Sequence, residues 1–463
     1  MMKRFFLAAL AVISLFSCGK DEKIPDNPTA NDVNVWVEKT LRQDYLYYTD
    51  MPEKSSLDFS KDPSAFFSAL LSSKDGKDLD GSHYYYSTLK KKTATKSIDA
   101  DNSYGYEFAI YKINSSTTDI AALVLYVLPN SPAAEAGLQR GDWVMTAGGT
   151  QITTSNYSTL LKSGSATTLG LYKYSTSEKT LVKDRIIPIA ASRIVEDTPF
   201  LCDTIYQIGG KKIAYLFYNH FMTGPDNADE TYNTRLKQIF TNYKSEGVTD
   251  FVLDMRYNGG GRVKSSQLMA SLLAPSSAFG NTFCYLVYND KNQKNNSTEK
   301  FESASSVKSA NLQLTHYYFI VTSSTASSSE LVINSLIPYL GRSNMTLIGT
   351  QTFGKVVGAS VYDYSDTYGY ILSPIAFYIY NAEHKADYAD GFTPDIIRNE
   401  LVLSSHGFYP LGDTRDYLLD AALSAITGQA SLYGRSTLRK ASSSMKLLGT
   451  SLDNEEREAT IEK

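Results

Sequence analysis

The feature that most constrains the fold is the stretch 317–333, where a strand pattern passes into a helix pattern through small hydroxyl residues. Residues 317–321 are aromatic and β-branched, which is the composition of a buried strand. From Leu331 onward, apolar residues recur at helical spacing. A strand, a tight turn and a helix place the turn at the positive end of a helix dipole. A nucleophilic serine is useful there, because backbone N–H groups can hold a developing oxyanion.

Two interpretations of this serine turn are open. Residues 323–329 could simply cap the helix, which is a common role for serine. A lysine farther along the chain favours a chemical role instead. A short apolar strand pattern at 345–348 follows the helix, and Lys355 comes soon after it. This lysine could return to the same edge of the sheet, although a lysine after Phe-Gly could equally be a solvated surface charge.

A strand–helix–strand pattern precedes this stretch. Residues 212–218 and 251–255 have strand composition, and apolar residues recur at helical spacing over 236–243. This order predicts a right-handed βαβ unit with a parallel sheet. The run Gly259-Gly260-Gly261 follows the second strand, at the end where α/β folds place their sites. Glycines there let backbone N–H groups approach a substrate closely.

Three motifs together resemble a known family. The run Thr325-Ala326-Ser327-Ser328-Ser329-Glu330 resembles the Ser-Ala-Ser-Ala-Ser-Glu signature of the C-terminal processing peptidases, serine peptidase family S41. Thr352-Phe353-Gly354-Lys355 resembles that family's Thr-Phe-Gly-Lys element. Leu253-Asp254-Met255-Arg256-Tyr257-Asn258-Gly259-Gly260-Gly261 resembles its Leu-Asp-Leu-Arg-x-Asn-x-Gly-Gly element. The three motifs stand in the family's order, and together they are specific.

The resemblance implies a multidomain α/β (α+β) chain whose peptidase domain is a ClpP/crotonase-like spiral of βα units. It implies that Ser327 is the nucleophile and Lys355 the general base. It also implies an oxyanion hole formed by the N–H of Gly259 or Gly260 together with that of Ser328.

The same resemblance makes Asp254 and Arg256 structural organisers, whereas on their own they could be a surface ion pair. The segment 391–396 resembles the family's Gly-x-x-Pro-Asp segment and closes the domain.

A lysine acts as a general base only when it is neutral. Burial against apolar groups disfavours the charged form and lowers the pKa of a lysine towards the working pH. Phe353, Val356 and Val357 give Lys355 such surroundings. We expect Lys355 to take the proton of Ser327, which attacks a peptide carbonyl and forms an acyl-enzyme that water clears.

The chain departs from the family at one position near the lysine. Family members often carry a glutamine four residues after it, where this chain has Ala359. Ser360 or Gln351 could take that role. The serine-to-lysine interval is also slightly longer than in bacterial relatives, which predicts a small loop near 342–344. A histidine-based triad is the competing chemistry, with His220 as its candidate.

The first 18 residues have the pattern of a lipoprotein signal peptide. A charged start precedes an apolar run over 5–16, which is too short for a comfortable transmembrane helix. Residues 15–18 resemble a bacterial lipobox in which Cys18 is lipidated, although Phe16 is bulkier than usual; an ordinary cleaved signal is the alternative. Residues 20–23 resemble the export tag of Bacteroidetes surface lipoproteins. The predicted location is extracytoplasmic, anchored by lipid to the outer membrane on its periplasmic or surface face.

Residues 19–30 are polar and predict a tether, and 31–98 predict a small helical domain. We expect Asp32 to cap the first helix and Asp62, followed by Pro63, to cap the second. Residues 198–428 are predicted to form the peptidase domain. Residues 429–463 are rich in Ser, Lys and Glu and predict a mobile tail.

Residues 99–185 are predicted to form a peptide-binding domain. The run 131–138, followed by Gly141-Asp142, resembles the core motif of PDZ domains. Such a domain binds a peptide C-terminus by adding it as a strand and holding its carboxylate with backbone N–H groups. The candidate loop for that carboxylate is Tyr104-Gly105-Tyr106-Glu107-Phe108. The expected partners are therefore polypeptides bound through a free C-terminus, unless the domain only braces the fold or gates the site.

Composition excludes some classes of function. The formal net charge is −4 and no basic block occurs, which argues against nucleic acid as a partner. The five histidines are scattered and predict no metal or other cofactor. We expect Cys202 and Cys284 to be buried free thiols, although a disulfide between them is the alternative. The rival to a serine peptidase is a non-catalytic, surface-anchored protein that captures peptides or glycans in a degenerate cleft.

Overall fold

The computed structural model describes residues 28–79, 81–92, 102–113, 118–175, 178, 180–225, 229–402, 407–434, 445–454 and 459–462. The predicted signal peptide with Cys18, and the tether up to residue 27, lie outside the described residues. Among the described residues, no helix has both the length and the apolar character needed to cross a membrane.

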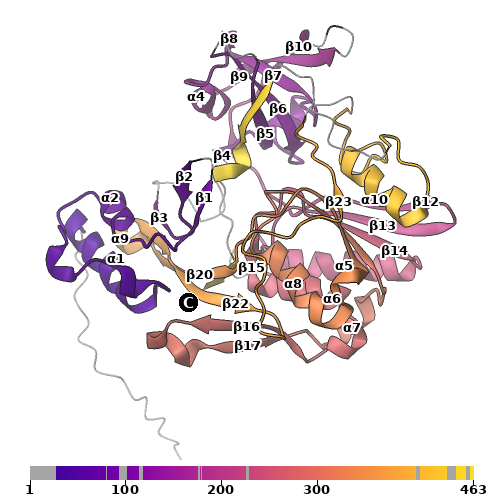
Figure 1. The fold of residues 1–463 in the computed structure, drawn as a ribbon. Coiled ribbons are helices and arrows are strands. Elements are labelled where there is room, and N and C mark those ends of the chain that lie inside the picture. Colours follow the sequence, from indigo (N-terminus) through magenta and orange to yellow (C-terminus); the bar gives the residue numbers. More distant parts are fainter. Residues whose placement is uncertain are drawn as a thin grey trace, which may run out of the picture.

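The N-terminal unit is small and lies to one side of the molecule (Figure 1). Its first helix begins one turn earlier than predicted: Thr29 is the cap, and the Asp32 carboxylate accepts the Thr29 N–H at 2.8 Å in a capping box. Asp62 and Pro63 start the second helix as predicted. The elements are α1 Ala30–Asp44, η1 Tyr48–Asp50, η2 Lys54–Ser56, α2 Pro63–Ser68, β1 Lys77–Leu79, β2 Ser82–Tyr84 and β3 Thr88–Lys91.

The PDZ-like unit is a sheet around its own apolar core. Ser131 caps a short helix, and Gly148 and Gly149, both at positive φ, turn one strand back on the next, as predicted. Its elements are β4 Asn102–Ser103, β5 Tyr106–Lys112, β6 Ile120–Val127, α3 Pro132–Glu135, β7 Trp143–Ala147, β8 Thr150–Gln151, α4 Tyr157–Leu161, β9 Thr167–Ser175, β10 Thr180–Ile189 and β11 Arg193–Ile194.

The largest unit is built on a six-stranded sheet in the order β12-β13-β14-β18-β19-β23, parallel from β13 onward. The predicted βαβ unit is formed by β13, α5 and β14, and its two strands pair in parallel. The strands are β12 Phe200–Ile208, β13 Lys211–Tyr218, β14 Asp250–Asp254, β18 Tyr317–Val321, β19 Met345–Gly349 and β23 Ile396–Ile397. The helices are α5 Thr231–Ser245, α6 Val263–Leu273, α7 Ser305–Ala310, α8 Ser328–Leu340 and α10 Tyr417–Thr427, with η3 Ser276–Ala278 and η5 Arg342–Asn344.

Alternate residues of each central strand face opposite layers, which explains why these strands are apolar throughout. Leu253 and Phe319 point to the layer of α5, α6 and α8. Val252 and Ile320 point to α10 on the other face (Figure 1). The carboxyl ends of β14 and β18 therefore lie side by side, and the turns that follow them meet at one edge.

A second sheet has the order β15-β25-β20-β22-β16-β17, with β21 and β3 attached. β3 of the N-terminal unit pairs with β21, which fixes that unit to the rest. The elements are β15 Gly261–Arg262, β16 Thr282–Tyr288, η4 Asp290–Asn295, β17 Ser297–Lys300, β20 Val357–Tyr364, α9 Ser365–Tyr368, β21 Tyr370–Ser373 and β22 Ile375–Tyr380.

The mobile tail expected for 429–463 is wrong where the structure describes it. Two strands occur there, β24 Lys446–Thr450, paired with β5, and β25 Ala459–Glu462, between β15 and β20, with η6 Ser451–Asn454 after β24. The polar composition suggested a free segment, but backbone pairing to existing sheet edges does not require an apolar sequence.

A buried ionic cluster joins the PDZ-like unit to the largest unit. Arg256, fully buried, donates to Asp254, Asp416 and Glu400, and Arg140 of the PDZ-like unit donates to the last two as well. Burial alone would raise the pKa of Asp416, but the two arginines hold it at about 2. Asp254 and Arg256 are therefore internal organisers and not a surface pair.

Candidate active site

The serine turn lies between the end of β18 and the start of α8. Ser327 has φ 57° and ψ −112°, a conformation that residues with a Cβ rarely adopt. Such strain costs on the order of 1–3 kcal/mol and is typical of functional sites. Ser327 is almost fully buried, and its Oγ has no hydrogen-bond partner among the described residues. The turn thus presents one hydroxyl that the fold itself does not use.

The neighbouring hydroxyl residues hold the turn against the glycine run. Ser328 Oγ donates to Gly261 O at 2.8 Å, and Ser329 Oγ donates to Asn258 O at 3.0 Å. Thr325 Oγ1 donates to Met255 O at 2.7 Å. These three hydroxyl groups therefore fix the turn by hydrogen bonds to backbone carbonyls. Ser327 differs from them because its hydroxyl makes no such bond within the described part of the chain.

Glu330 joins the serine turn to the lysine segment. Its carboxylate accepts the backbone N–H groups of Ser327 and Lys355, each at 2.9 Å, on the same oxygen. The two nitrogens therefore lie no farther apart than twice that distance. The other oxygen accepts the Gly354 N–H and the Thr352 hydroxyl, each at 2.6 Å.

The Glu330 carboxylate is fully buried in the first turn of α8, where the helix dipole favours a negative charge. Burial raises the pKa of Glu330 to about 7, although its four hydrogen-bond donors oppose that rise. The sequence motif contained this residue, but its clamping role follows only from the folded geometry.

The Lys355 side chain is 2% exposed, so the expected apolar surroundings are present. Its Nζ lies 4.9 Å from the centre of the Tyr86 ring. Tyr86 belongs to the N-terminal unit, and both Tyr84 and Tyr86 pack against Phe353. No sequence signal linked these tyrosines to the lysine, because they lie far away along the chain.

The glycine run provides the other wall of the site. Gly260 and Gly261 both have positive φ, and a Cβ on Gly261 would lie 2.6 Å from Phe221 O. The Gly260 N–H donates to Asn258 Oδ1 at 2.9 Å. Of the two glycines predicted for the oxyanion hole, Gly260 is thus engaged by a side chain, and Gly259 is the better candidate.

The alternative residues lie elsewhere. His220 contacts Asp197 O at 2.6 Å, accepts the Met222 N–H and packs on the Tyr232 ring, and none of these partners belongs to the serine turn. Gln351 is exposed and donates to Asp390 O. Ala359 and Ser360 are buried in β20. Among the described residues, Cys202 and Cys284 are free thiols, and no cluster of His, Cys, Asp and Glu could hold a metal ion.

Four of the five residues predicted to hold a peptide carboxylate, Tyr104, Tyr106, Glu107 and Phe108, line one hollow of about 270 Å³ between β5 and the end of α4. Gly105 has φ 78°, and a Cβ there would lie 2.2 Å from that of Ser131, so only glycine fits. Tyr104 and Tyr106 are buried. Burial raises the pKa of Glu107 to about 7, against the lowering effect of Ser451 and Lys162.

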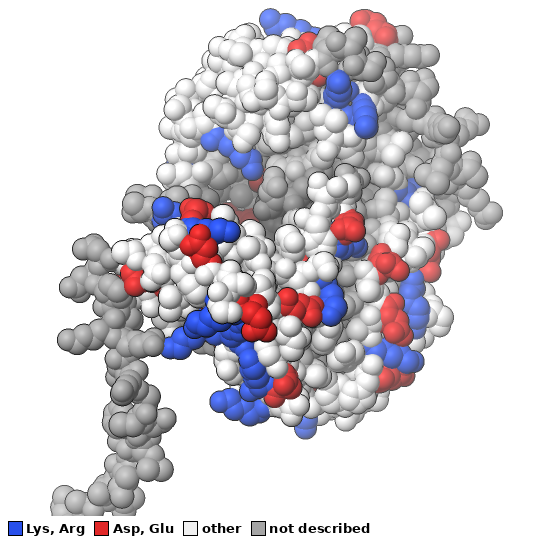
Figure 2. Space-filling model, turned by 60° about the vertical axis from the view of Figure 1, so that its left-hand side comes forward, with Lys and Arg blue, Asp and Glu red and all other residues white. Residues whose placement is uncertain are grey.

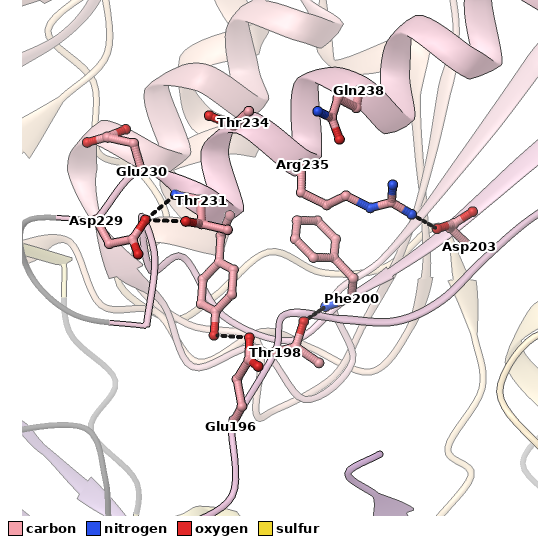
Figure 3. Close-up of a pocket in the computed structure, with 11 residues that line it drawn as sticks. Glu196, Thr198, Phe200, Asp203, Asp229, Glu230, Thr231, Thr234, Arg235 and Gln238 are labelled. Carbon is pink, nitrogen blue, oxygen red and sulfur yellow. Dashed lines mark hydrogen bonds and ion pairs between the residues drawn. The ribbon is translucent and has the colours of Figure 1, made fainter. Parts of the chain in front are cut away.

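A larger hollow of about 670 Å³ lies elsewhere, between the outer face of α5 and the start of β12 (Figure 3). Two of its carboxylates pair with other lining residues: Glu196 accepts from Tyr232, and Asp203 lies 3.8 Å from Arg235. None of its lining residues belongs to the serine turn, the glycine run or the lysine segment. Charges of both signs are interspersed over the molecular face in Figure 2.

Comparison with known proteins gives consistent matches along the chain. A family model described as peptidase family S41 matches residues 212–398, one described as the peptidase S41 N-terminal domain matches 32–88, and a PDZ domain model matches 123–172. The crystal structure of a Bacteroides fragilis protein named as an S41 protease is similar, with a TM-score of 0.73, 36% identity, and coverage of 85% of this chain and 97% of that one.

Two curated relatives are named carboxyl-terminal-processing protease. The one from Picosynechococcus sp. is 26% identical over 307 residues, which span 66% of each chain. The one from Synechocystis sp. is 25% identical over 328 residues, 70% of this chain and 69% of the relative. The chain thus spans about two thirds of the length of these relatives.

Proposed function

The chain belongs to peptidase family S41, and we propose that it is a serine endopeptidase of the C-terminal processing type that uses Ser327 as nucleophile and Lys355 as general base. The observation that carries the proposal is the Glu330 carboxylate, one oxygen of which holds the backbone of both residues. A strained, buried serine with an unused hydroxyl and a buried lysine on the same clamp suit acyl transfer.

In the first half of the reaction, Lys355 Nζ takes the proton of Ser327 Oγ as that oxygen bonds to the substrate carbonyl carbon. The same proton then passes to the leaving amine as the C–N bond breaks. Water, deprotonated by Lys355, attacks the acyl-enzyme; the bond between the acyl carbon and Ser327 Oγ breaks, the proton held by Lys355 returns to Ser327 Oγ, and the new carboxyl group is released. Lys355 is 2% exposed, so bulk water has little access to the group that is proposed to take the proton.

The developing oxyanion is held by two backbone N–H groups, those of Gly259 and Ser328. Ser328 is the first residue of α8, so its N–H lies at the positive end of the helix dipole. Asn258 supports the glycine side: it is fully buried, accepts the Gly260 N–H and donates to Tyr218 O. Loss of one such donor typically lowers the rate about 10²–10³-fold.

Substrate recognition uses the PDZ-like unit, which takes the free C-terminus of a polypeptide along β5 and the loop 104–108. We further propose that the mature chain begins at lipidated Cys18 and works outside the cytoplasm, anchored to the outer membrane. Mass spectrometry of the N-terminal peptide, with a Cys18→Ala variant that should leave the membrane fraction, tests this anchor. An unmodified Cys18 would refute it.

The reaction is tested with a fluorophosphonate probe, which labels activated serines. The full chain should be labelled at Ser327, and Ser327→Ala should abolish the labelling. Lys355→Ala should slow it about 10²–10⁴-fold, the usual contribution of a general base. Ser323→Ala, an exposed serine in the same turn, and Lys385→Ala, an exposed lysine, are the matched controls.

Far-UV circular dichroism should show that all four variants keep the fold of the parent chain. Labelling and peptide hydrolysis that persist in folded Ser327→Ala or Lys355→Ala would remove that residue from the mechanism. Absence of both in the full chain would favour the non-catalytic capture protein instead.

A further inference from the structure

β24 occupies the outer edge of β5, where PDZ domains take their ligands. It runs antiparallel to β5, with Lys446 opposite Lys112 and Thr450 opposite Ala109. An added peptide strand in such a domain runs towards the carboxylate loop at the start of the receiving strand. β24 runs in that direction, since its last residues lie nearest the loop 104–108. The chain's own segment therefore stands where a peptide ligand would bind.

Ser451, directly after β24, contacts the loop itself. The Phe108 N–H donates to Ser451 Oγ at 2.9 Å, and that hydroxyl donates to Phe108 O at 3.2 Å. An N–H of the predicted carboxylate loop is thus already engaged by a side chain of the same molecule. A peptide C-terminus that needs this N–H can bind only after Ser451 has left.

β25 occupies a second position, next to the serine and the lysine. It pairs in parallel with β15 on one side and β20 on the other: Ala459 lies opposite both Gly261 and Gly358. β15 begins directly after the Gly259–Gly260 pair, and β20 begins two residues after Lys355. Without β25 these strands would leave a slot about 10 Å wide, which one extended strand fills. Figure 1 shows the C-terminal end beside β20 and β22.

The direction of β25 indicates how a substrate would lie. Because both pairings are parallel, the N-terminal end of β25 faces Gly260 and Lys355, and its later residues run away from them along β20. A polypeptide in this slot would have its scissile bond on the N-terminal side of the paired residues. The slot then holds the C-terminal fragment of the substrate, which leaves with a new amino group when the acyl-enzyme forms.

We propose that β24 and β25 occupy two peptide-binding sites of their own chain, the β5 edge and the β15–β20 slot. An extended polypeptide substrate binds these sites only by displacing the two strands. The assignment of the slot to substrate rests on the proposed function, whereas displacement at both edges can be tested by binding alone.

The hold on β24 is weak enough for exchange. Leu447 and Leu448 within the strand are 36% and 46% exposed, whereas Met445 before it packs against the core and Ser451 and Leu452 after it are buried. Edge strands with few buried side chains are replaced readily by another strand of suitable length. A tethered strand nevertheless competes at an effective concentration in the millimolar range.

The test measures binding by fluorescence anisotropy in the Ser327→Ala background, where no probe is cut. The probe is a fluorescein-labelled peptide with the sequence 445–454 and a free C-terminus. The receiving chains are the full chain, a variant that ends at Ser444, and one that ends at Asn454 and so lacks only β25. We expect the variant ending at Ser444 to bind at least about tenfold more tightly than the full chain, as millimolar competition requires. Equal affinities for the full chain and that variant would overturn the proposal.

The second peptide tests the slot: a probe of sequence 459–463 should bind more tightly to the variant ending at Asn454 than to the full chain. Equal affinity there would overturn the β25 part of the proposal.

A cross-linked chain makes the test independent of truncation, which could impair folding. Ala109 and Thr450 lie directly opposite each other, so Ala109→Cys with Thr450→Cys should form a disulfide that locks β24 onto β5. The oxidised chain should bind the 445–454 probe at least about tenfold more weakly than the reduced chain, and the two single variants should be insensitive to oxidant. Equal binding in both states would refute displacement. Fluorophosphonate labelling of the parent chain is read separately, so failure of the peptidase proposal remains distinguishable from failure of this one.

Discussion

Replacing Thr352 by Val should shift the pH dependence of serine labelling, because Thr352 is one of the four donors to Glu330. Its hydroxyl donates to the carboxylate at 2.6 Å, in a site with 4% exposure. A buried hydrogen bond to a charged group contributes about 1.5–3 kcal/mol. Donors favour the charged carboxylate, so losing this one raises the pKa of Glu330. One pKa unit corresponds to about 1.4 kcal/mol, which predicts a rise of about one to two units.

The consequence for activity follows from the form of Glu330 that clamps the site. The carboxylate is the form that accepts all of these donors, because protonation turns one oxygen of Glu330 into a donor and weakens it as an acceptor. In the parent chain the pKa of Glu330 is about 7, and in Thr352→Val the active form is reached only at higher pH. At pH 7 the clamped fraction should fall about 5- to 50-fold.

The assay is the initial rate of fluorophosphonate labelling at Ser327 between about pH 5 and 10. The acid limb of the profile should move upward by about one to two units in Thr352→Val. Thr352→Ser, which keeps the hydroxyl, should leave it in place. Folded Thr352→Val with the midpoint of the parent chain would refute the argument that the Glu330 carboxylate holds the two residues in working geometry.

Three further predictions concern stability, measured as the free energy of unfolding in urea. Arg256→Met leaves buried carboxylates without their partner and should lose about 3–5 kcal/mol, whereas Arg415→Met, at an exposed pair, should change the free energy of unfolding little; similar losses would contradict the role of burial. Gly354→Ala places a Cβ 2.2 Å from Ala389 O and should destabilise by more than Gly369→Ala, which also has a positive φ but has open space around it; equal losses would refute the steric argument. The pKa of Glu330 is raised in the folded chain from 4.5 to about 7, so its contribution to stability is present below pH about 4.5 and is lost as pH rises through about 7. Glu330→Gln should flatten the pH dependence in that window, and an unchanged slope would argue against this titration.

The sequence predicted those parts of the fold that depend on local pattern. The strand, turn and helix around Ser327 form as the sequence indicates, because a short aromatic and β-branched run suits a strand buried on both faces and apolar residues at a period of 3.6 suit a helix. The cap at Asp62 was also predicted, since its signal lies within three residues. The first helix was placed one turn late, because Thr29 and Asp32 are both good caps and only the geometry distinguishes a cap from the third residue of a capping box.

The parts that the sequence did not predict depend on contacts between distant segments. The Tyr86 ring approaches Lys355 because β3 of the N-terminal unit pairs with β21. This pairing between distant segments produces no periodic pattern in the sequence. The strands β24 and β25 are only five and four residues long, and both are held by backbone pairing to strands far away in the sequence, so no local pattern predicts them. The catalytic roles of Ser327 and Lys355 came from motif resemblance, and they stay predictions until labelling tests them.

The shared carboxylates at Arg140 have a consequence for how the PDZ-like unit can move. Arg140 reaches from that unit into the ionic cluster around Arg256, where both arginines donate to Glu400 and Asp416. Swinging the unit outward would strip a guanidinium from two carboxylates that no water reaches, a penalty of several kcal/mol. We therefore expect the PDZ-like unit to keep its position relative to the largest unit. Strands would exchange at the edge of β5 without a hinge motion of the whole unit.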